Sequence, residues 1–446
     1  MPVVRAFRGL RYNLDRVDIA RVVAPPYDVI PEPRRAALCA GDPHNVAHLT
    51  LGREPLTDAP PPTRYEQAAR DLAQWRVEQV LVRDPRPALY VYEQEYRLAN
   101  DPALTRRRGV IALVKLHRYE ERVILPHEGT LPRPKADRLK LMEATQCSFS
   151  PVFAIYSDPS DPGRGALDRL ARGEPEFEVT DGEGVAHRLW AATDLRAVRA
   201  FEEAMADQTI VIADGHHRYE TALAYRDAMR SRHGEHPDAP WQYALMFLCN
   251  VDAADVTIFP CHRLIRKTEP EVLASLEHRA AEAFDVERIP LPGRGPERVA
   301  ALEDRLQQMA ARGGREHVFA AYWGADYAVT LAIRDYRKAL GLCGESDGGV
   351  LWELDVALLH CALIEGLLGL RGARAASGEN VFFTREPREA IASVDAGESA
   401  IALFVNATRV DQVIRLAATG RQMPQKGTYF WPKLLTGTVM HDLRAR

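Results

Sequence analysis

Strand-like and helix-like segments follow one another along most of this 446-residue chain. Strand patterns alternate or form short apolar runs, whereas helix patterns place apolar residues three and four positions apart. This mixture predicts an α+β fold, in which mixed sheets are packed against helices. We expect strands over residues 88–96, 109–116, 152–156, 209–213, 243–248, 256–259, 317–323, 327–333 and 399–405. We expect helices over residues 64–82, 196–207, 219–232, 270–284, 296–312, 352–369 and 409–419.

The chain is too long for one ordinary domain, so more than one hydrophobic core is expected. We predict an N-terminal α/β domain over residues 1–150 and a second domain over residues 151–285, which contains the sharpest motif. A C-terminal α/β domain would then span residues 286–446. The charged stretch 286–297, which contains glycine and proline, is interpreted as a boundary or an excursion.

Composition excludes several classes of protein. Hydrophobic residues make up 46% of the chain and charged residues 27%, which is typical of a folded protein and not of a disordered one. The 58 lysines and arginines are balanced by 62 aspartates and glutamates, so there is no overall attraction to nucleic acid or anionic membrane. No signal peptide or membrane helix is evident. We therefore expect a cytoplasmic protein without a nucleic-acid or membrane partner.

The cysteines are scattered and include no Cys-x-x-Cys pair. This spacing does not indicate a zinc site or a disulfide framework. All six are predicted to be reduced and mostly buried thiols, as is usual in the cytoplasm. They are Cys39, Cys147, Cys249, Cys261, Cys343 and Cys361.

The sharpest motif lies in residues 210–218, where an apolar strand pattern ends in a turn and a helix begins. Free N–H groups and the positive end of the helix dipole meet at such a turn, and a nearby arginine completes a phosphate cradle. A glycine there leaves room for a ligand, and a histidine can exchange protons near neutral pH. The alternative is that Asp214 only caps the helix and one histidine packs in the core. The candidates are Asp214, His216 and His217 for catalysis, with Gly215 and Arg218 for binding.

A second cluster of polar residues occupies the loop and helix start at residues 125–139. Glu128 is suited to accept a proton from a hydroxyl substrate, and the cations that follow can offset phosphate charge. Pro134 suits a first helical turn, so a helix is expected near Lys135. The alternative is a solvated charged loop. The candidates are His127, Glu128, Thr130, Lys135 and Arg138.

A third cluster, residues 423–433, follows a helix that is expected to end at Gly420. Its three consecutive aromatic residues, flanked by lysines, can stack on a base and bind phosphates. The alternative is a structural tail whose aromatic side chains pack on the core. The candidates are Lys426, Thr428, Tyr429 and Lys433.

Several well-known signatures do not occur in this sequence. It contains no G-x-x-x-x-G-K-[ST] and no H-E-x-x-H, and neither G-x-G-x-x-G nor G-x-S-x-G occurs directly after an expected strand. The absence of these signatures argues against a P-loop NTPase, a Rossmann dehydrogenase, a zincin and an α/β-hydrolase. No flavin, haem or NAD signature is present either.

On these motifs the chain resembles the domain-of-unknown-function 1015 proteins of bacteria and archaea, over nearly its whole length. The motifs that carry this resemblance are Pro25–Asp28, His127–Thr130, Lys135–Arg138, Ala213–Tyr219, Pro260–Arg263, Met423–Phe430 and Pro432–Lys433.

The strand–Asp-Gly-His-x-Arg–helix unit is also similar to the nucleotide-binding turn of the ParB/sulfiredoxin-like superfamily. That superfamily includes CTP-binding partition proteins, the ATP-dependent sulfiredoxin and an ADP-dependent free serine kinase. The resemblance implies ADP or ATP with Mg²⁺ as cofactors, and a ParB-like nucleotide site within the fold. The partition proteins' helix-turn-helix is not evident here. In these relatives the backbone and basic side chains of the motif hold phosphates. By this resemblance the motif falls on Asp214, Gly215, His216 and Arg218, and His217 matches a variable position.

Three functions remain open at this point. The first is a nucleotide-dependent phosphotransferase for a small hydroxylated metabolite, with L-serine or O-phosphoserine as candidates, acting as a kinase or, in reverse or with water, as a phosphatase. The second is a nucleotide-binding regulator with slow hydrolysis. The third is a metal-dependent hydrolase. Partners would be the nucleotide and the metabolite, and a homodimer is an open alternative to a monomer. The hydrolase would use Asp214, His216 or His217, His127 and Glu128.

Overall fold

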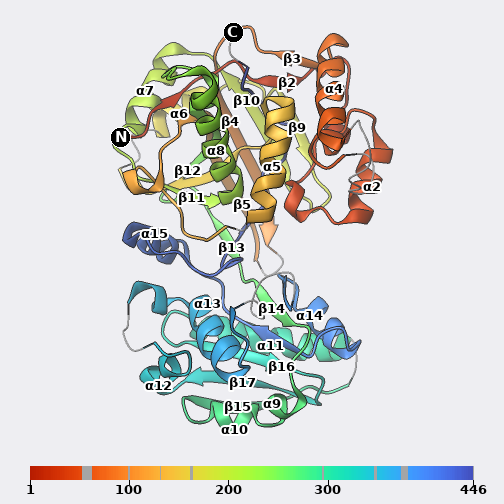
Figure 1. The fold of residues 1–446 in the computed structure, drawn as a ribbon, viewed down its shortest axis with the longest axis vertical. Coiled ribbons are helices and arrows are strands. Elements are labelled where there is room, and N and C mark those ends of the chain that lie inside the picture. The colour runs from red at the N-terminus through yellow and green to blue at the C-terminus, as the bar shows by residue number, and fades with distance from the viewer. Residues whose placement is uncertain are drawn as a thin grey trace. The chain divides into compact units, whose positions relative to one another are not determined.

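The computed structural model describes residues 1–52, 63–98, 101–130, 132–160, 164–293, 296–345, 349–372 and 380–444. Helices and strands mix in several sheets within these ranges (Figure 1), so the α+β prediction is confirmed. The chain forms two compact units. Unit 1 comprises Met1–Pro126, Thr130–Val256 and Pro432–Arg446, and unit 2 comprises His127–Gly129 and Thr257–Trp431.

This division differs from the three predicted domains. The boundary predicted after residue 150 lies inside unit 1, and the boundary after residue 285 falls within strand β15 (Phe284–Pro290) of unit 2. Pairing between distant segments explains the difference. The C-terminal strand β21 (His441–Asp442) returns to pair with β7 (Cys147–Ser148) in unit 1. The pairing of two segments that lie far apart in the chain cannot be inferred from local composition.

Unit 1 is built on a nine-stranded mixed sheet. The order is β6-β11-β8-β12-β5-β4-β10-β9, and β1 also pairs with β5. Most neighbours are antiparallel, whereas β11 with β6 and β12 with β8 are parallel. The bounds are β1 Val4–Arg5, β4 Leu89–Leu98, β5 Asp101–Lys115, β6 Ile124–Leu125, β8 Val152–Tyr156, β9 Phe177–Thr180, β10 Ala186–Ala192, β11 Ile210–Asp214 and β12 Tyr243–Asn250. A separate pair joins β2 (Leu10–Tyr12) and β3 (Leu81–Arg83).

The helices of unit 1 bury their apolar stripes against this sheet and against one another. In α7 (Leu195–Met205) the buried residues recur with helical spacing, and Asp194 caps the helix by accepting from the backbone N–H of Ala197 at 2.8 Å. Helices α5 (Pro132–Thr145) and α8 (His216–His233) pack side by side (Figure 1). The others are α1 Ile19–Val22, α2 Glu32–Gly41, α3 Ala47–Thr50, α4 Arg64–Val77 and α6 Arg164–Leu170.

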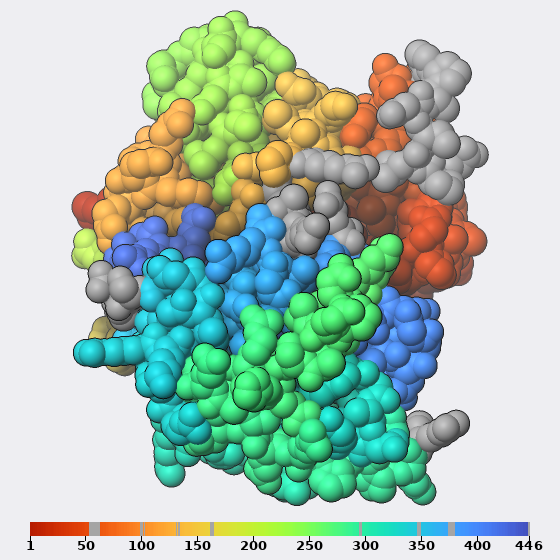
Figure 2. Space-filling model, turned by 60° about the horizontal axis from the view of Figure 1, so that its bottom comes forward, coloured from red at the N-terminus to blue at the C-terminus, as the bar shows by residue number. Residues whose placement is uncertain are grey.

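Unit 2 is built on a six-stranded antiparallel sheet in the order β15-β17-β16-β19-β14-β18. Alternate residues of β16 (Val318–Tyr322) enter two different hydrophobic clusters, so both faces of the sheet are covered. A second pair joins β13 (Thr257–Phe259) and β20 (Tyr429–Trp431). The remaining strands are β14 His262–Ile265, β17 Tyr327–Ile333, β18 Val381–Thr384 and β19 Ile401–Phe404. The helices are α9 Pro270–Ala274, α10 Leu276–Ala280, α11 Pro296–Arg312, α12 Tyr336–Gly341, α13 Asp355–Leu358, a π-helix Leu359–Leu367, α14 Pro387–Asp395 and α15 Val410–Thr419. Figure 2 shows the surface around α9 and α10 in green.

Two predicted segments of unit 2 have a different structure. The helix expected over residues 270–284 is divided into α9 and α10 at Ser275, and the chain enters β15 at Phe284. The stretch 286–297, interpreted as a boundary or an excursion, contains most of β15 and the start of α11. Pairing with β17 along seven residues stabilises β15 despite its charged side chains.

One pair of cysteines corrects the prediction of six reduced thiols. Cys343 and Cys361 form a disulfide with their Cα atoms 5.3 Å apart, a normal separation for such a bond. The other four cysteines are not in a disulfide, and three of them are buried. A spacing of 18 residues does not reveal that two thiols meet when the chain folds. Among the described residues, no helix has the length and apolarity needed to cross a membrane.

Candidate functional site

The predicted turn at Asp214 joins the end of β11 to the start of α8. Gly215 has φ 93° and ψ 30°, a left-handed conformation that favours glycine. The backbone N–H of Tyr219 donates to the carbonyl of Gly215 at 3.0 Å, which closes the first helical turn. The N–H groups before Tyr219 belong to this first turn, where a helix has no earlier carbonyls to pair with. An 18-residue helix therefore begins with its positive dipole end at the motif, as predicted.

The carboxylate of Asp214 holds two cations. Arg218 Nη2 donates to Oδ2 at 2.6 Å, and Lys433 Nζ donates to Oδ1 at 2.8 Å. The three side chains are only 13–20% exposed, so water screens these ion pairs weakly. Arg218 also donates to the carbonyl of Pro151. Two cations and one carboxylate leave one net positive charge at the start of α8.

Arg218 lies directly against Gly215. A Cβ atom at position 215 would be 2.8 Å from Arg218 Cζ, closer than such atoms approach. The backbone conformation therefore favours glycine here, and a larger residue would displace the guanidinium of Arg218. In this structure the guanidinium occupies the space beside Gly215 that the sequence suggested for a ligand.

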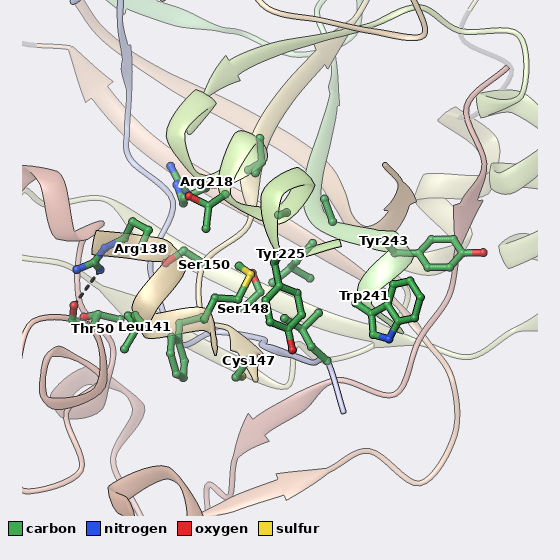
Figure 3. Close-up of a pocket in the computed structure, with 18 of the residues that line it drawn as sticks. Thr50, Arg138, Leu141, Cys147, Ser148, Ser150, Arg218, Tyr225, Trp241 and Tyr243 are labelled. Carbon is green, nitrogen blue, oxygen red and sulfur yellow. Dashed lines mark hydrogen bonds between the residues drawn. The ribbon is translucent and has the colours of Figure 1, made fainter. Parts of the chain in front are cut away.

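A cavity of about 60 Å³ lies beside Arg218 in unit 1 (Figure 3). Arg138, Arg218 and Ser150 lie toward one end, and Trp241 and Tyr243 lie toward the other. This volume holds a few water molecules, whereas sites for drug-sized ligands measure about 300–1,000 Å³. The cavity by itself does not accommodate a nucleotide.

Arg138, a predicted phosphate ligand, makes several contacts within unit 1. Its guanidinium donates to the carbonyl of Thr50 at 2.9 Å and to Asp137 Oδ2 at 2.7 Å. Its Cζ also lies 4.1 Å from the ring centre of Tyr27. Burial lowers the pKa of Arg138, and burial followed by the charge of Asp28 raises the pKa of Tyr27. These contacts give Arg138 a packing role.

Glu220 of α8 accepts hydrogen bonds from two of the predicted residues. It was not among the candidates proposed from the sequence. Lys135 Nζ and Thr130 Oγ1 both donate to Glu220 Oε2 at 2.7 Å. Tyr119 donates to Oε1 at 3.5 Å, and burial is the main cause that raises the pKa of this phenol. Glu220 lies four residues after His216, and this spacing along the helix was the available signal.

Five of the predicted residues lie in unit 2. His127 is fully buried, and its Nε2 lies 3.0 Å from Thr428 Oγ1. The backbone N–H of Met423 donates to the carbonyl of His127 at 2.8 Å, and Glu128 forms a parallel bridge with Met423. The His-Glu loop and the C-terminal motif, about 300 residues apart in sequence, therefore meet in this unit.

A buried arginine, Arg263, donates hydrogen bonds to backbone carbonyls in the same part of unit 2. Arg263 Nη2 donates to the carbonyl of Lys426 at 3.1 Å, and Arg263 Nη1 donates to the carbonyl of Cys261. Burial lowers the pKa of Arg263, and burial together with Arg263 lowers the pKa of His262 to about 3. Tyr429 lies in β20, where Arg385 Cζ is 5.3 Å from its ring centre. The three consecutive aromatic residues thus form a strand.

The candidate residues therefore fall into two groups, and each group is held together by contacts within its own unit. Across the described ranges, no group of three or more His, Cys, Asp or Glu side chains is arranged to hold a metal ion. Unit 1 contains Thr130, Lys135, Arg138, Asp214, Gly215, His216, His217, Arg218 and Lys433. Unit 2 contains His127, Glu128, Lys426, Thr428 and Tyr429.

A family model described as protein of unknown function (DUF1015) matches residues 4–357 of the chain. The chain therefore belongs to this family, and the resemblance inferred from its motifs is confirmed. A comparison with curated proteins gave no match.

Solved structures that resemble the chain include free serine kinase in complex with AMP. That structure has a TM-score of 0.33 and 12% identity, with coverage of 69% of this chain and 83% of the kinase. A conserved hypothetical protein from Pyrococcus furiosus has a TM-score of 0.32 and 13% identity, with coverage of 69% and 87%. SbnI with a C-terminal truncation, from Staphylococcus aureus, has a TM-score of 0.31 and 11% identity, with coverage of 74% and 86%. Likeness at this level carries no argument about function.

Proposed function

We propose that this member of the DUF1015 family binds the phosphate groups of a nucleotide at the turn between β11 and α8. We further propose that it transfers a phosphoryl group between the nucleotide and a small hydroxylated metabolite. One observation supports the proposal. Two cations, Arg218 and Lys433, are held on Asp214 at the positive end of an 18-residue helix that follows a left-handed glycine.

A phosphate group competes with Asp214 for the same two cations. An arginine offers a planar pair of donors to phosphate oxygens, and a lysine adds a compact positive charge. Asp214 keeps both side chains ordered before the nucleotide arrives, so binding costs less side-chain entropy. The first-turn N–H groups of α8 supply further donors.

The reaction requires a phosphoryl donor, a hydroxyl acceptor and neutralisation of the charge that develops during transfer. ADP or ATP is the proposed donor, and L-serine is a candidate acceptor, with O-phosphoserine as the substrate of the reverse reaction. His216 or His217 is the proposed proton acceptor. A cytoplasmic location remains a prediction from the sequence. Whether the protein is a monomer or a homodimer also remains open.

The residues present do not form a magnesium site by themselves. Asp214 is the carboxylate at the turn, and both of its oxygens accept from cations. Mg²⁺ is usually held by one or two carboxylates together with substrate phosphates and water. No step is therefore assigned to a metal ion.

The proposal is tested by calorimetry with ADP and ATP and by ³¹P NMR of mixtures with L-serine or O-phosphoserine. We expect nucleotide binding by the intact chain, with Kd raised about 10- to 100-fold in Arg218→Ala, because a charge-assisted hydrogen bond is lost. The control is Arg196→Ala, at an exposed position of α7. Failure of the intact chain to bind either nucleotide would contradict the proposal.

A nucleotide-binding regulator is the second candidate, and one observation favours it. Two carboxylates at the start of α8 in unit 1, Asp214 and Glu220, accept from cations or a hydroxyl, so neither is held ready to take a proton from a substrate. In that case nucleotide binding occurs without phosphoryl transfer and shifts a conformational equilibrium or an assembly state. Binding without any change in the ³¹P spectrum, accompanied by a change in sedimentation, would select this function.

A further inference from the structure

Unit 2 contains a polar cleft of about 380 Å³ that none of the sequence motifs predicted. Its walls come from the segment after α11, the start of α13 and the start of α15. This volume is enough for a small metabolite. The residues that line the cleft include Gly313, Gly314, His317, Asp355, Asn406 and Arg409.

The carboxylate of Asp355 has two hydrogen-bond partners in the cleft. His317 Nδ1 lies 2.6 Å from Asp355 Oδ1, and Asn406 Nδ2 donates to Asp355 Oδ2 at 3.1 Å. Because the nitrogen of the Asn406 amide must face this carboxylate, the orientation of the amide is determined. Its oxygen is therefore directed away from Asp355.

That oxygen is an acceptor without a donor. Asn406 is only 9% exposed, and no residue in the described part of the chain donates to its Oδ1. A buried acceptor without a donor is unfavourable, because it has lost its hydrogen bonds to water. Asn406 lines the cleft, and its Oδ1 is closed off from water, so a small shift of the amide must accompany donation from a ligand N–H or O–H group.

Two consecutive glycines allow polar groups of the cleft to pack closely against the chain. A Cβ atom at Gly313 would lie 3.1 Å from Asn406 Nδ2, and one at Gly314 would lie 3.1 Å from Arg409 Nη1. The amide of Asn406 and the guanidinium of Arg409 thus both border the same short turn.

Arginines provide the cationic side of the cleft. Arg409 lines it together with Arg315 and Arg415. Arg409 pairs with Asp411 at 3.0 Å, but its side chain is 47% exposed and that of Asp411 is 57% exposed. Such an exposed pair is weak, so a ligand carboxylate can replace it. The cleft therefore offers an acceptor and a fixed carboxylate for a cation, and guanidinium groups for an anion.

We propose that this cleft binds a free α-amino acid. Its ammonium group donates to Asn406 Oδ1 beside the charge of Asp355, and its carboxylate accepts from Arg409. This site belongs to unit 2 and rests on contacts separate from those of the proposed nucleotide site, so each can fail without the other.

The test measures thermal stability of the full chain with each of the twenty standard L-amino acids, followed by calorimetry for those that stabilise it. We expect at least one to bind, and its counterparts that lack either the amino group or the carboxylate not to bind. Arg409→Gln and Asn406→Leu should each raise Kd about tenfold or more, since each removes one charged hydrogen bond. Because Asn406→Leu also removes a partner of Asp355, the exposed Arg409→Gln keeps the test valid if that variant fails to fold.

The controls separate the two sites of the protein. Arg388→Gln alters a guanidinium that is 71% exposed elsewhere in unit 2, and should leave Kd unchanged. Arg218→Ala, in unit 1, should also leave Kd unchanged. The proposal is overturned if no amino acid binds, so that the cleft holds water alone. It is equally overturned if binding is lost in Arg218→Ala but retained in Arg409→Gln.

Discussion

At the scale of single residues, Asp214 is the centre of the candidate nucleotide site. It is not an N-cap, because Gly215 occupies that position and the Asp214 side chain pairs with Arg218 and Lys433. Lys433 comes from a segment more than 200 residues away in sequence. In the proposed function, Asp214 is the internal anion that a phosphate replaces on these two cations.

This role leads to a prediction for Asp214→Asn. If the carboxylate competes with phosphate, removing its charge should tighten ADP binding by up to about tenfold, since one ion pair of about 1 kcal/mol no longer competes. The variant should also be less stable, because two partly buried cations lose their anion. Calorimetry with ADP gives the affinity, and Glu203→Gln, at an exposed position of α7, is the control. Weaker ADP binding by Asp214→Asn would show that the carboxylate assists the phosphate instead.

At the scale of secondary structure, the β11–α8 junction decides where the first-turn N–H groups point. The predicted strand over residues 209–213 corresponds to β11, and the predicted helix over residues 219–232 corresponds to most of α8. The junction depends on a backbone conformation that alanine adopts with strain. It also depends on the small size of Gly215, against which Arg218 packs.

Gly215→Ala should therefore destabilise unit 1 and weaken nucleotide binding together. The left-handed conformation alone costs alanine about 1–2 kcal/mol, and the contact with Arg218 adds to this cost. Urea unfolding measures the loss. The matched control is Gly182→Ala, because a Cβ atom at Gly182 would meet nothing within 4 Å. Equal stability of the two variants would contradict the argument.

At the scale of the whole molecule, each unit buries a neutral histidine. Burial is the largest cause that lowers the pKa of His441 in unit 1 to about 4, and of His262 in unit 2 to about 3. An unfolded histidine has a pKa near 6.5, so the unfolded chain binds more protons than the native chain below that pH. Stability should therefore fall as the pH falls from about 6.5 towards 4.

The expected loss is about 3 kcal/mol for each of the two histidines by pH 4. Urea unfolding at pH 7 and at pH 4.5 measures this loss. His441→Gln and His262→Gln should each flatten the acid dependence, even if they lower stability at pH 7, whereas His278→Gln, at an exposed position, should not. An unchanged acid dependence in both buried variants would contradict the assignment.

The sequence alone was enough to predict many of the longer elements of the fold and the local motifs. Apolar periodicity and turn residues act over a few positions, so strands such as 152–156 and the strand–glycine–helix unit at residues 210–218 could be located from neighbouring residues. Family membership followed from the same motifs. Which motifs meet was decided only by the tertiary structure. The pairing of Asp214 with Lys433, the contact of His127 with Thr428 and the Cys343–Cys361 bond each join segments through chain topology. The cleft around Asn406 likewise requires three separate segments to converge, and no local pattern encodes that convergence.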